Sequence, residues 1–453
     1  MPGRAVVAVV ASCALVVPVT GALAEPGRTG PHFADAHGIH VVGVRRIDDR
    51  DLNVKVSSAA LGRAVDVRIL LPEGYRSHPS RRYPVLYLFH GTSGRASDWI
   101  KSGDAEKTTA PYPLITVMPD AGFDGNGGGW FTDWVDTQTK LGPSRWETFH
   151  IGQLVPWVDA NLRTVASRRG RAIAGLSQGG FGSTSYAARH PDMFAATAAF
   201  SGAPEIDRDP QVIVGSTAVI EATAVGLDGV EPEAMFGSRV TNEVNWQGHD
   251  PAMLIPNLRG MSIWLWTATG LPGPYDSEPN PAASGIEFLT HESTSRFHTH
   301  LDEAGIPSHY DDYTYGEHTF AYWARDLRQF VGPLMRVFAH PPKPTSMSYT
   351  SIDSRWSQWG WSASFARAAT QEFGSVTHGT AKGFDVSGSG TATVTTPAFY
   401  PPGSALRVVI EAPGTRTVIT EPVSGRLTVQ ISLGSALPSR AAVATVRVHR
   451  LSS

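Results

Sequence analysis

Cysteine is nearly missing from this sequence: among its 453 residues there is one, Cys13. A chain without a second thiol forms no internal disulfide and offers no cysteine pair to a metal. An excess of one charge is missing too, because 38 basic residues stand against 41 acidic ones, for a formal net charge of −3. The absence of a basic stripe argues against a nucleic-acid partner, and the absence of a polybasic cluster argues against an electrostatic membrane contact.

Motifs that bind metals are lacking as well. The sequence contains no HExxH and no EF-hand loop, and Asp120 and Asp124 in PDAGFDGNGGGW (119–130) have the wrong spacing for a calcium loop. We therefore expect no metal site and no cofactor. The glycine-rich stretch itself is interpreted as a flexible loop.

Residues 1–24 have the three parts of a secretory signal. Arg4 supplies the positive start, residues 5–19 the apolar run, and Ala22–Ala24 the small-residue cleavage site. The run is short for crossing the ~30 Å of a bilayer core, and a lipid-modified Cys13 is the weaker alternative because few apolar residues precede it. We expect cleavage after Ala24, a location outside the cell or in the cell envelope, and a mature chain held together by a large core without disulfides.

Strands and helices alternate through the first 340 residues. Runs rich in valine and isoleucine, and continuous apolar runs, predict strands near residues 39–46, 52–57, 64–71, 83–91, 114–122, 171–177 and 261–270. Apolar or small residues at helical spacing predict helices over residues 146–165, 181–191, 288–305 and 318–340. The alternation indicates an α/β fold, in which a mostly parallel sheet carries helices on both faces.

The pattern changes after His340, where PPKPT forms a proline-rich linker (341–346). Beyond it, stretches that alternate apolar and polar residues between Gly/Pro turns predict an antiparallel, small all-β sandwich-like domain. We therefore divide the chain into a signal (1–24), an α/β domain (25–340) that opens with a loose polar leader (25–38), the linker, and a C-terminal β domain (347–453).

Three tryptophans stand close together at the start of this β domain, in WSQWGWSASF (356–365). On one continuous strand, Trp359 and Trp361 would share a face and Trp356 would lie on the other. We expect core packing, the commoner use of tryptophan in small β domains. Stacking on the sugar rings of a cell-wall polysaccharide is the alternative.

A serine within a cluster of glycines interrupts the α/β pattern at residues 175–179, which match G-x-S-x-G. The motif follows a buried strand and precedes a helix, which is the context of a nucleophile held on a sharp turn. An N-cap serine is the alternative, but a cap needs neither the flanking glycines nor the preceding strand. We interpret Ser177 as a nucleophile.

A serine hydroxyl needs a base, and the chain order Ser…Asp/Glu…His places base and acid downstream. His318 in YGEHTFAYW lies at a loop-to-helix boundary near the end of the α/β domain, and we choose it as the base. His291, His298 and His300 lie on a polar helix and are expected to be solvated. The acid stays open, with these eligible residues: Asp276, Glu278, Glu287 and Glu292.

Two backbone N–H groups should stabilise the oxyanion that such an attack creates. One is expected from Gln178, directly after the nucleophile, and the other from Thr92 in the loop HGTSG (90–94). The glycine-rich stretch 119–130 should border the same site, with Trp130 and Trp134 as candidate walls that contact the substrate.

Several segments together resemble the secreted mycolyltransferases of the antigen 85 group and their actinobacterial esterase relatives. The resemblance runs through about residues 45–335, and its segments are WFTDW (130–134), WETFHIGQLVPWVDANLRTV (146–165), AIAGLSQGG (172–180), HDPAMLIPNLRGMSIWLWTATG (249–270) and GEHTFAYW (316–323). It implies an α/β-hydrolase fold and a Ser-Glu-His triad. Matched segment by segment, it selects Glu287 as the acid, because Phe297 and Gly305 follow at the family's spacing.

One departure concerns the loop after the third family strand. Where the mycolyltransferases have Asp-Gly-Leu-Arg, which helps to hold trehalose, this chain has His90-Gly91-Thr92-Ser93. We therefore expect a secreted serine esterase or acyltransferase that acts on acyl esters and releases the acyl group to water or to a sugar or lipid acceptor. Mycolyl transfer to trehalose and a non-catalytic wall- or carbohydrate-binding protein are the alternatives. The sequence does not decide whether the acyl group goes to water or to an acceptor. It also leaves the acyl chain and the oligomeric state open.

Overall fold

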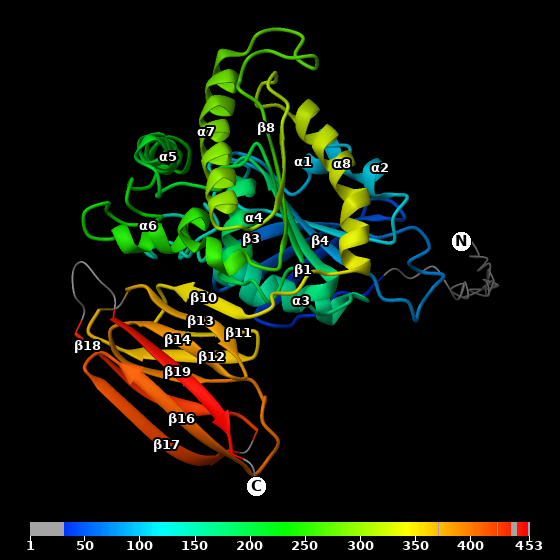
Figure 1. The fold of residues 1–453 in the computed structure, drawn as a ribbon. Coiled ribbons are helices and arrows are strands. Elements are labelled where there is room, and N and C mark those ends of the chain that lie inside the picture. The colour runs from blue at the N-terminus through cyan, green and yellow to red at the C-terminus, as the bar shows by residue number, and fades with distance from the viewer. Residues whose placement is uncertain (1–30, 370, 424, 436–441, 452–453) are drawn as a thin grey trace, which may run out of the picture.

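The computed structural model describes residues 31–369, 371–423, 425–435 and 442–451, so the predicted signal lies outside the described residues. Two parts follow one another along the chain (Figure 1). The first, called the α/β part, comprises residues 31–340, and the second, called the β part, comprises residues 347–451. Helix α8 ends at Ala339 and strand β10 begins at Met347, which brackets the proline-rich stretch.

A nine-stranded sheet forms the centre of the α/β part, in the order β1-β2-β3-β5-β4-β6-β7-β8-β9. Its strands are β1 (Ile39–Arg46), β2 (Asp51–Ser58), β3 (Ala64–Leu70), β4 (Val85–Phe89), β5 (Ile115–Pro119), β6 (Arg171–Leu176), β7 (Ala196–Phe200), β8 (Ser262–Thr267) and β9 (Ser308–Asp312). Strands β1 to β3 pair antiparallel, and all pairs from β5 through β4 to β9 are parallel. All seven predicted strands are present, and β7 and β9 were not predicted.

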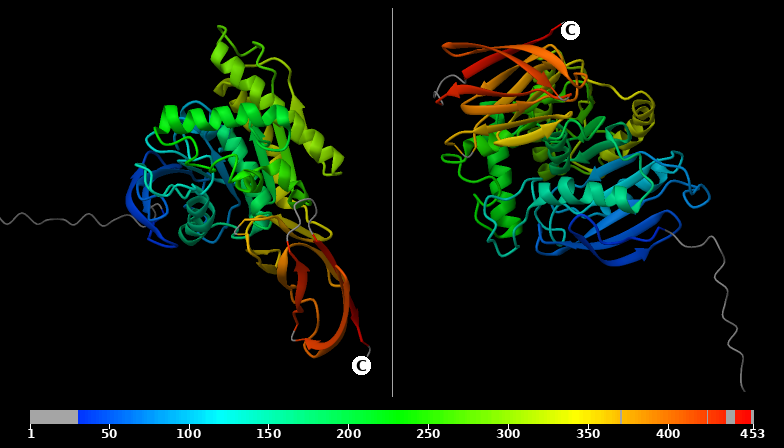
Figure 2. Two further views of the ribbon diagram at one scale, coloured as in Figure 1. Left: turned by 90° about the vertical axis from the view of Figure 1, so that its left-hand side faces the viewer. Right: turned by 90° about the horizontal axis from the view of Figure 1, so that it is seen from below.

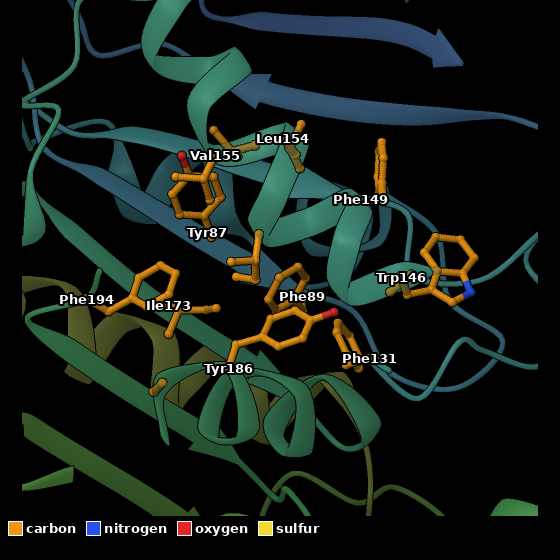
Figure 3. Packing of buried hydrophobic residues seen from close by; sticks show 14 of the residues in the cluster. Tyr87, Phe89, Phe131, Trp146, Phe149, Leu154, Val155, Ile173, Tyr186 and Phe194 are labelled. Atoms are coloured by element: carbon orange, nitrogen blue, oxygen red, sulfur yellow. The ribbon is translucent and has the colours of Figure 1, made fainter. Parts of the chain in front are cut away.

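Helices cover both faces of this sheet. They are α1 (Asp98–Lys101), α2 (Ala105–Thr109), η1 (Thr148–Leu154), α3 (Val155–Asn161), η2 (Arg168–Gly170), α4 (Gln178–Arg189), α5 (Pro210–Ala222), η3 (Thr223–Asp228), α6 (Glu243–His249), η4 (Pro251–Leu258), α7 (Pro281–Glu303) and α8 (Phe320–Ala339). Alternate side chains of each strand point to opposite faces. Tyr87 and Phe89 of β4 thus pack with α4 and η1 (Figure 3), whereas Leu86 and Leu88 pack with α1, α2 and α8.

Two antiparallel sheets make up the β part. They have the orders β10-β13-β14-β19-β16-β17 and β11-β12-β15-β18, and their buried side chains form one hydrophobic cluster. The strands are β10 (Met347–Ser351), β11 (Arg355–Gln358), β12 (Trp361–Ala366), β13 (Gly374–Thr380), β14 (Gly383–Gly388), β15 (Gly390–Thr395), β16 (Ser404–Ala412), β17 (Thr415–Val423), β18 (Thr428–Gly434) and β19 (Ala442–Arg450). The predicted antiparallel β architecture is therefore observed.

The face assignment of the three tryptophans is wrong. Trp356 and Trp361 are both buried in the cluster of the β part, whereas Trp359 is only half-buried. Gln358 pairs with Trp361 across a two-residue turn, and Trp359 has a positive φ of 55° in that turn. The segment is a hairpin and not one strand, so the alternation of faces restarts after Gly360.

Residues 31–38, the described end of the leader, are anchored and not loose. Phe33 stacks on Trp157 of α3 with ring centroids 5.4 Å apart. The Ala34 carbonyl accepts a hydrogen bond from Trp157 Nε1 at 2.9 Å, and the Ala34 amide donates to Asn161 Oδ1 at 2.7 Å. The ring of Phe33 and the backbone of Ala34 thus hold this end of the leader on the core.

The β part contacts the α/β part at the edge where the parallel strands begin (Figure 2). Tyr349 Oη donates to the Arg189 carbonyl at 2.7 Å, and the Trp359 amide donates to Asp192 at 2.9 Å. Both acceptors lie just before β7. Asn257, just before β8, exchanges two hydrogen bonds with the backbone of Thr350. These contacts use groups that are fixed in both parts.

Candidate active site

Ser177 stands on a strained turn between β6 and α4, with φ 53° and ψ −124°. The flanking glycines permit this turn: a Cβ on Gly175 would lie 2.3 Å from the Gly179 carbonyl oxygen, and one on Gly179 would lie 2.4 Å from the His90 carbonyl oxygen. Strain of this kind persists where the surrounding structure enforces it, and it clusters at functional sites. Ser177 lines a cavity of about 1000 Å³ at the carboxyl ends of the parallel strands.

His318 lines the same cavity from the loop before α8. Its Nδ1 lies 2.7 Å from Oε2 of Glu287, a carboxylate on α7 that is buried. The second oxygen, Oε1, accepts a hydrogen bond from the Ala268 amide at 2.9 Å. A carboxylate only accepts, so Nδ1 carries the proton and Nε2 is left as an acceptor. Nε2 has no hydrogen-bond partner within the part of the chain that the structure describes.

Among the described residues, no hydrogen bond or ion pair links the other candidate acids to His318. Asp276 Oδ2 accepts hydrogen bonds from Tyr322 Oη at 2.7 Å and from the Glu317 amide at 3.2 Å. Glu292 lines the cavity, but its carboxylate is not bonded to His318 in the part of the chain that the structure describes. Glu278 is exposed. Ser177 and His318 thus line one cavity and Glu287 is bonded to His318, which is the set that the resemblance implied, while no hydrogen bond among the described residues joins Ser177 to His318.

Thr92 and Gln178 meet beside Ser177. Gln178 begins α4, where the first backbone amides have no partner within the helix. Its side-chain Nε2 donates to Thr92 Oγ1 at 3.1 Å, and the next residue, Ser93, donates its amide to the Gly127 carbonyl at 2.6 Å. No hydrogen bond among the described residues uses the Thr92 amide. The two predicted oxyanion donors therefore lie on elements that neighbouring bonds hold in place.

Of the two candidate tryptophan walls, one lines the cavity. Trp130 lies on it and packs against Phe181 of α4, with centroids 5.6 Å apart. Trp134 is buried in the core and donates its Nε1 to the Gly129 carbonyl at 3.1 Å. Its predicted place in the wall is not observed, because the chain turns inward after Trp130, where Trp130 and Phe131 both have positive φ.

The longest apolar wall of the cavity was not predicted. It comes from α5, η3 and the start of α7, through Val212, Val219, Leu227, Phe288 and Leu289. The helical segment Pro210–Asp228 is long and apolar enough, by length and composition only, to cross a membrane. Of the 18-residue apolar window within it, 22% is buried inside the structure. The signal for this segment in the sequence is its apolar run, PQVIVGSTAVIEATAVGLD (210–228).

The apolar wall is joined to the glycine-rich loop through Asp228, at the end of η3. The Gly128 amide donates to its Oδ2 at 3.2 Å. Burial raises the pKa of Asp228 to about 6, against the opposing effects of that hydrogen bond and of Lys140. The Gly127 carbonyl of the same glycine-rich loop accepts a hydrogen bond from the Ser93 amide. The glycine-rich loop therefore holds both the apolar wall and the loop that contains Thr92.

Comparison with known proteins places this geometry in a family. Residues 58–333 match the family model described as "Putative esterase". The chain belongs to this esterase family. The resemblance to the antigen 85 group, drawn from the segments around Ser177 and His318, is confirmed.

Individual relatives agree with the family. The chain is 34% identical to Esterase Rv1288 of Mycobacterium tuberculosis over 63% of its own length and 59% of that protein. It thus spans about three fifths of that relative. It is 28% identical to the diacylglycerol acyltransferase/mycolyltransferase Ag85B of Mycolicibacterium smegmatis, over 62% of this chain and 83% of that one. The crystal structure of M. tuberculosis MPT51 shares the fold, with a TM-score of 0.52 at 23% identity, covering 64% of this chain and 100% of that chain. All three matches leave about a third of this chain uncovered.

Proposed function

We propose that this protein is a serine esterase or acyltransferase that acts on acyl esters through Ser177, His318 and Glu287. The observation that carries the proposal is the strained Ser177 turn, which faces the same cavity as a histidine bonded at 2.7 Å to a buried carboxylate. Membership in the esterase family supports the reaction class.

In the proposed reaction, Ser177 Oγ attacks the ester carbonyl carbon while its proton passes to His318 Nε2. The carbonyl oxygen becomes an oxyanion, which the amides of Gln178 and Thr92 stabilise. The tetrahedral intermediate collapses, the carbon–oxygen bond to the alcohol breaks, and His318 returns the proton to the leaving alcohol. Water or an acceptor hydroxyl then attacks the acyl-enzyme by the same steps in reverse. Glu287 stabilises the imidazolium that forms, and in the neutral ring it keeps the proton on Nδ1.

The substrate that fits best has an apolar acyl chain. The wall of α5, η3 and α7 offers aliphatic and phenyl groups to the cavity, which Trp130 also lines. Pockets of this size and lining bind largely apolar ligands, with a few polar groups setting their orientation. Transfer to a hydroxyl of a sugar or lipid acceptor would use the same acyl-enzyme, and the Ag85B relative is named as an acyltransferase and mycolyltransferase.

The remaining proposals concern organisation and location. Residues 1–24 would be a secretory signal, so that the mature enzyme acts outside the cell or in the cell envelope. Residues 25–340 would form the catalytic domain and residues 347–453 a sandwich-like β domain that serves stability or docking. Every cavity-lining residue lies between His90 and Trp323, which supports this division.

A fluorophosphonate probe tests the proposal directly. The wild-type protein should be labelled covalently at Ser177, and the Ser177→Ala variant should not be labelled although it folds. Comparable labelling of the variant would remove Ser177 from the mechanism, and no labelling of folded wild-type protein would favour a non-catalytic carbohydrate-binding role. A series of p-nitrophenyl esters of increasing chain length, with and without trehalose, then separates hydrolysis from transfer.

A further inference from the structure

A group of three potential metal ligands lies at the apolar wall of the cavity, which one of them, Glu205, also lines. Glu205 stands in the loop after β7, Asp209 directly precedes α5, and His300 is in the last turns of α7. One ligand atom from each lies within 4.8 Å of the other two. His300 was expected to be solvated on a polar helix, but its side chain is only 11% exposed. These residues are not among those proposed to take part in the ester reaction.

Glu205 has an unused oxygen that points into this group. Its side chain is fully buried, and Oε2 has no hydrogen-bond partner among the described residues. A buried carboxylate oxygen without a donor is costly unless a cation or a proton compensates it.

The spacing of the three groups favours a cation over an ion pair. His300 Nε2 lies 3.5 Å from Glu205 Oε2 and also 3.5 Å from Asp209 Oδ2, and it has no hydrogen-bond partner among the described residues. A charge-assisted hydrogen bond from an imidazolium would bring one of these oxygens to about 2.7–2.9 Å. Ligands at the usual Zn–N and Zn–O distances of about 2.1 Å stand roughly 3.4 Å apart in a tetrahedron.

The surrounding hydrogen bonds orient two of the three ligands, His300 and Glu205. His300 Nδ1 lies 3.1 Å from Glu303 Oε2, so Nδ1 donates there and the Nε2 lone pair is turned toward the two carboxylates. Metal-bound histidines regularly carry such a carboxylate on the other ring nitrogen. The Asp209 amide donates to Glu205 Oε1 at 2.9 Å, and Ser293 of α7 bonds both the amide and the carbonyl of Glu205.

We propose that Glu205, Asp209 and His300 bind a divalent transition-metal ion of the zinc class. One imidazole and two carboxylates suit Zn²⁺ better than Mg²⁺ or Ca²⁺, which prefer oxygen ligands alone. The ion would join the end of α7 to the loop that leads into α5, two segments that the hydrogen bonds between Ser293 and Glu205 already link. Its role is structural: it would hold the apolar wall of the cavity, and it takes no part in the ester reaction.

Zinc binding to the full chain tests the proposal. Protein stripped with EDTA is titrated with Zn²⁺ in a calorimeter, and bound metal is counted after dialysis by elemental analysis. Wild type should bind one equivalent, and Ser177→Ala should bind it equally, which separates this site from the proposed catalysis. The matched control is His298→Ala on the same helix, whose Nδ1 bonds Ser308 at 3.1 Å and which should also bind normally.

Variants at the site should bind in a graded way. Glu303→Gln, which alters only the group behind His300, should weaken Zn²⁺ binding by about 10–100-fold. Glu205→Gln and His300→Gln should weaken Zn²⁺ binding more than Glu303→Gln does. His300→Gln is chosen over His300→Ala because it keeps a side chain of polar character and similar length, and circular dichroism checks that it folds. With Co²⁺ as the probe, the intense visible absorption of tetrahedral coordination should be present in wild type and lost in His300→Gln. Zinc stoichiometry below one in wild type, unchanged binding in His300→Gln, or displacement of Zn²⁺ by millimolar Mg²⁺ would each overturn the assignment.

Discussion

Replacing Glu287 by glutamine is the sharpest test of the proposed triad, because the structure says which hydrogen bonds the amide keeps. The carboxylate accepts two short ones, from the Ala268 amide at 2.9 Å and from His318 Nδ1 at 2.7 Å, and a long one of 3.5 Å from Thr267 Oγ1 to the oxygen that Ala268 also binds. Glutamine has one oxygen for the two close donors. If its NH₂ faced the Ala268 amide, two donors would oppose each other in a fully buried place, at a cost of about 1–3 kcal/mol. The oxygen should therefore stay on Ala268 and the NH₂ should face His318.

That arrangement turns the histidine into the wrong tautomer. Nδ1 must then accept, so the proton moves to Nε2, which no longer takes the Ser177 proton. The comparable amide substitution in another serine enzyme lowers kcat by about 10⁴, which corresponds to about 5.5 kcal/mol of transition-state stabilisation. We expect a loss of this order in kcat on a p-nitrophenyl ester, with an unchanged circular dichroism spectrum. Glu292→Gln, also on α7 and on the cavity, should lose less than about tenfold. A Glu287→Gln enzyme that keeps a tenth of wild-type kcat, or an equal loss in Glu292→Gln, would refute the reasoning.

Four further predictions concern the loop beside Ser177, the buried ion pair of Arg189, its pH dependence and the division into two parts. Gly179→Ala should lower kcat by about tenfold or more while the fold is kept, because its Cβ would press on the His90 carbonyl beside the Thr92 loop; normal kinetics would show that this loop does not have to be held. Arg189→Ala should lower the free energy of unfolding in urea by about 3–5 kcal/mol, since it leaves Glu147 buried without its main counterion. Burial alone would raise the pKa of Glu147, but the neighbouring Arg189, His190 and His249 outweigh burial and lower that pKa. The free energy of unfolding of the wild type should therefore decrease as the pH falls below about 4.3. An equally steep loss in Arg189→Ala would contradict this. Residues 25–340 alone should keep activity on soluble esters, because the cavity is lined by residues 90 to 323, while melting earlier than the full chain; folded but inactive protein would show that the β part contributes to the site.

Burial explains which elements could be predicted from the sequence. Strands such as β4 and β6 are continuous apolar runs, so their position between two helical layers is visible in the residues themselves. Strand β7 reads ATAAF and is equally buried, but alanine is depleted in strands generally, and packing alone selects it here. Strand β9 reads SHYDD at the sheet edge, where one side of the strand has no neighbour and polar residues are tolerated.

The candidate site divides in the same way. Ser177 stands in a local motif and His318 in a recognisable segment, so both could be selected without tertiary information. The acid could not, because the residues alone left four carboxyl groups eligible, and only the resemblance selected Glu287 from among them. The group of Glu205, Asp209 and His300 was missed because its members come from segments about 90 residues apart and share no sequence spacing.

The attachment of the β part to the starting edge of the parallel strands determines which way the enzyme faces. Ser177 and His318 lie at the opposite edge, where those strands end. If the β part were fixed to a polysaccharide or another surface, the cavity would open away from the anchoring point, toward incoming substrate. The contacts through Arg189, Asp192 and Asn257 would keep that orientation without a flexible tether. The β part would then set the orientation of the cavity and of Ser177, and it would leave the chemistry of Ser177 unchanged.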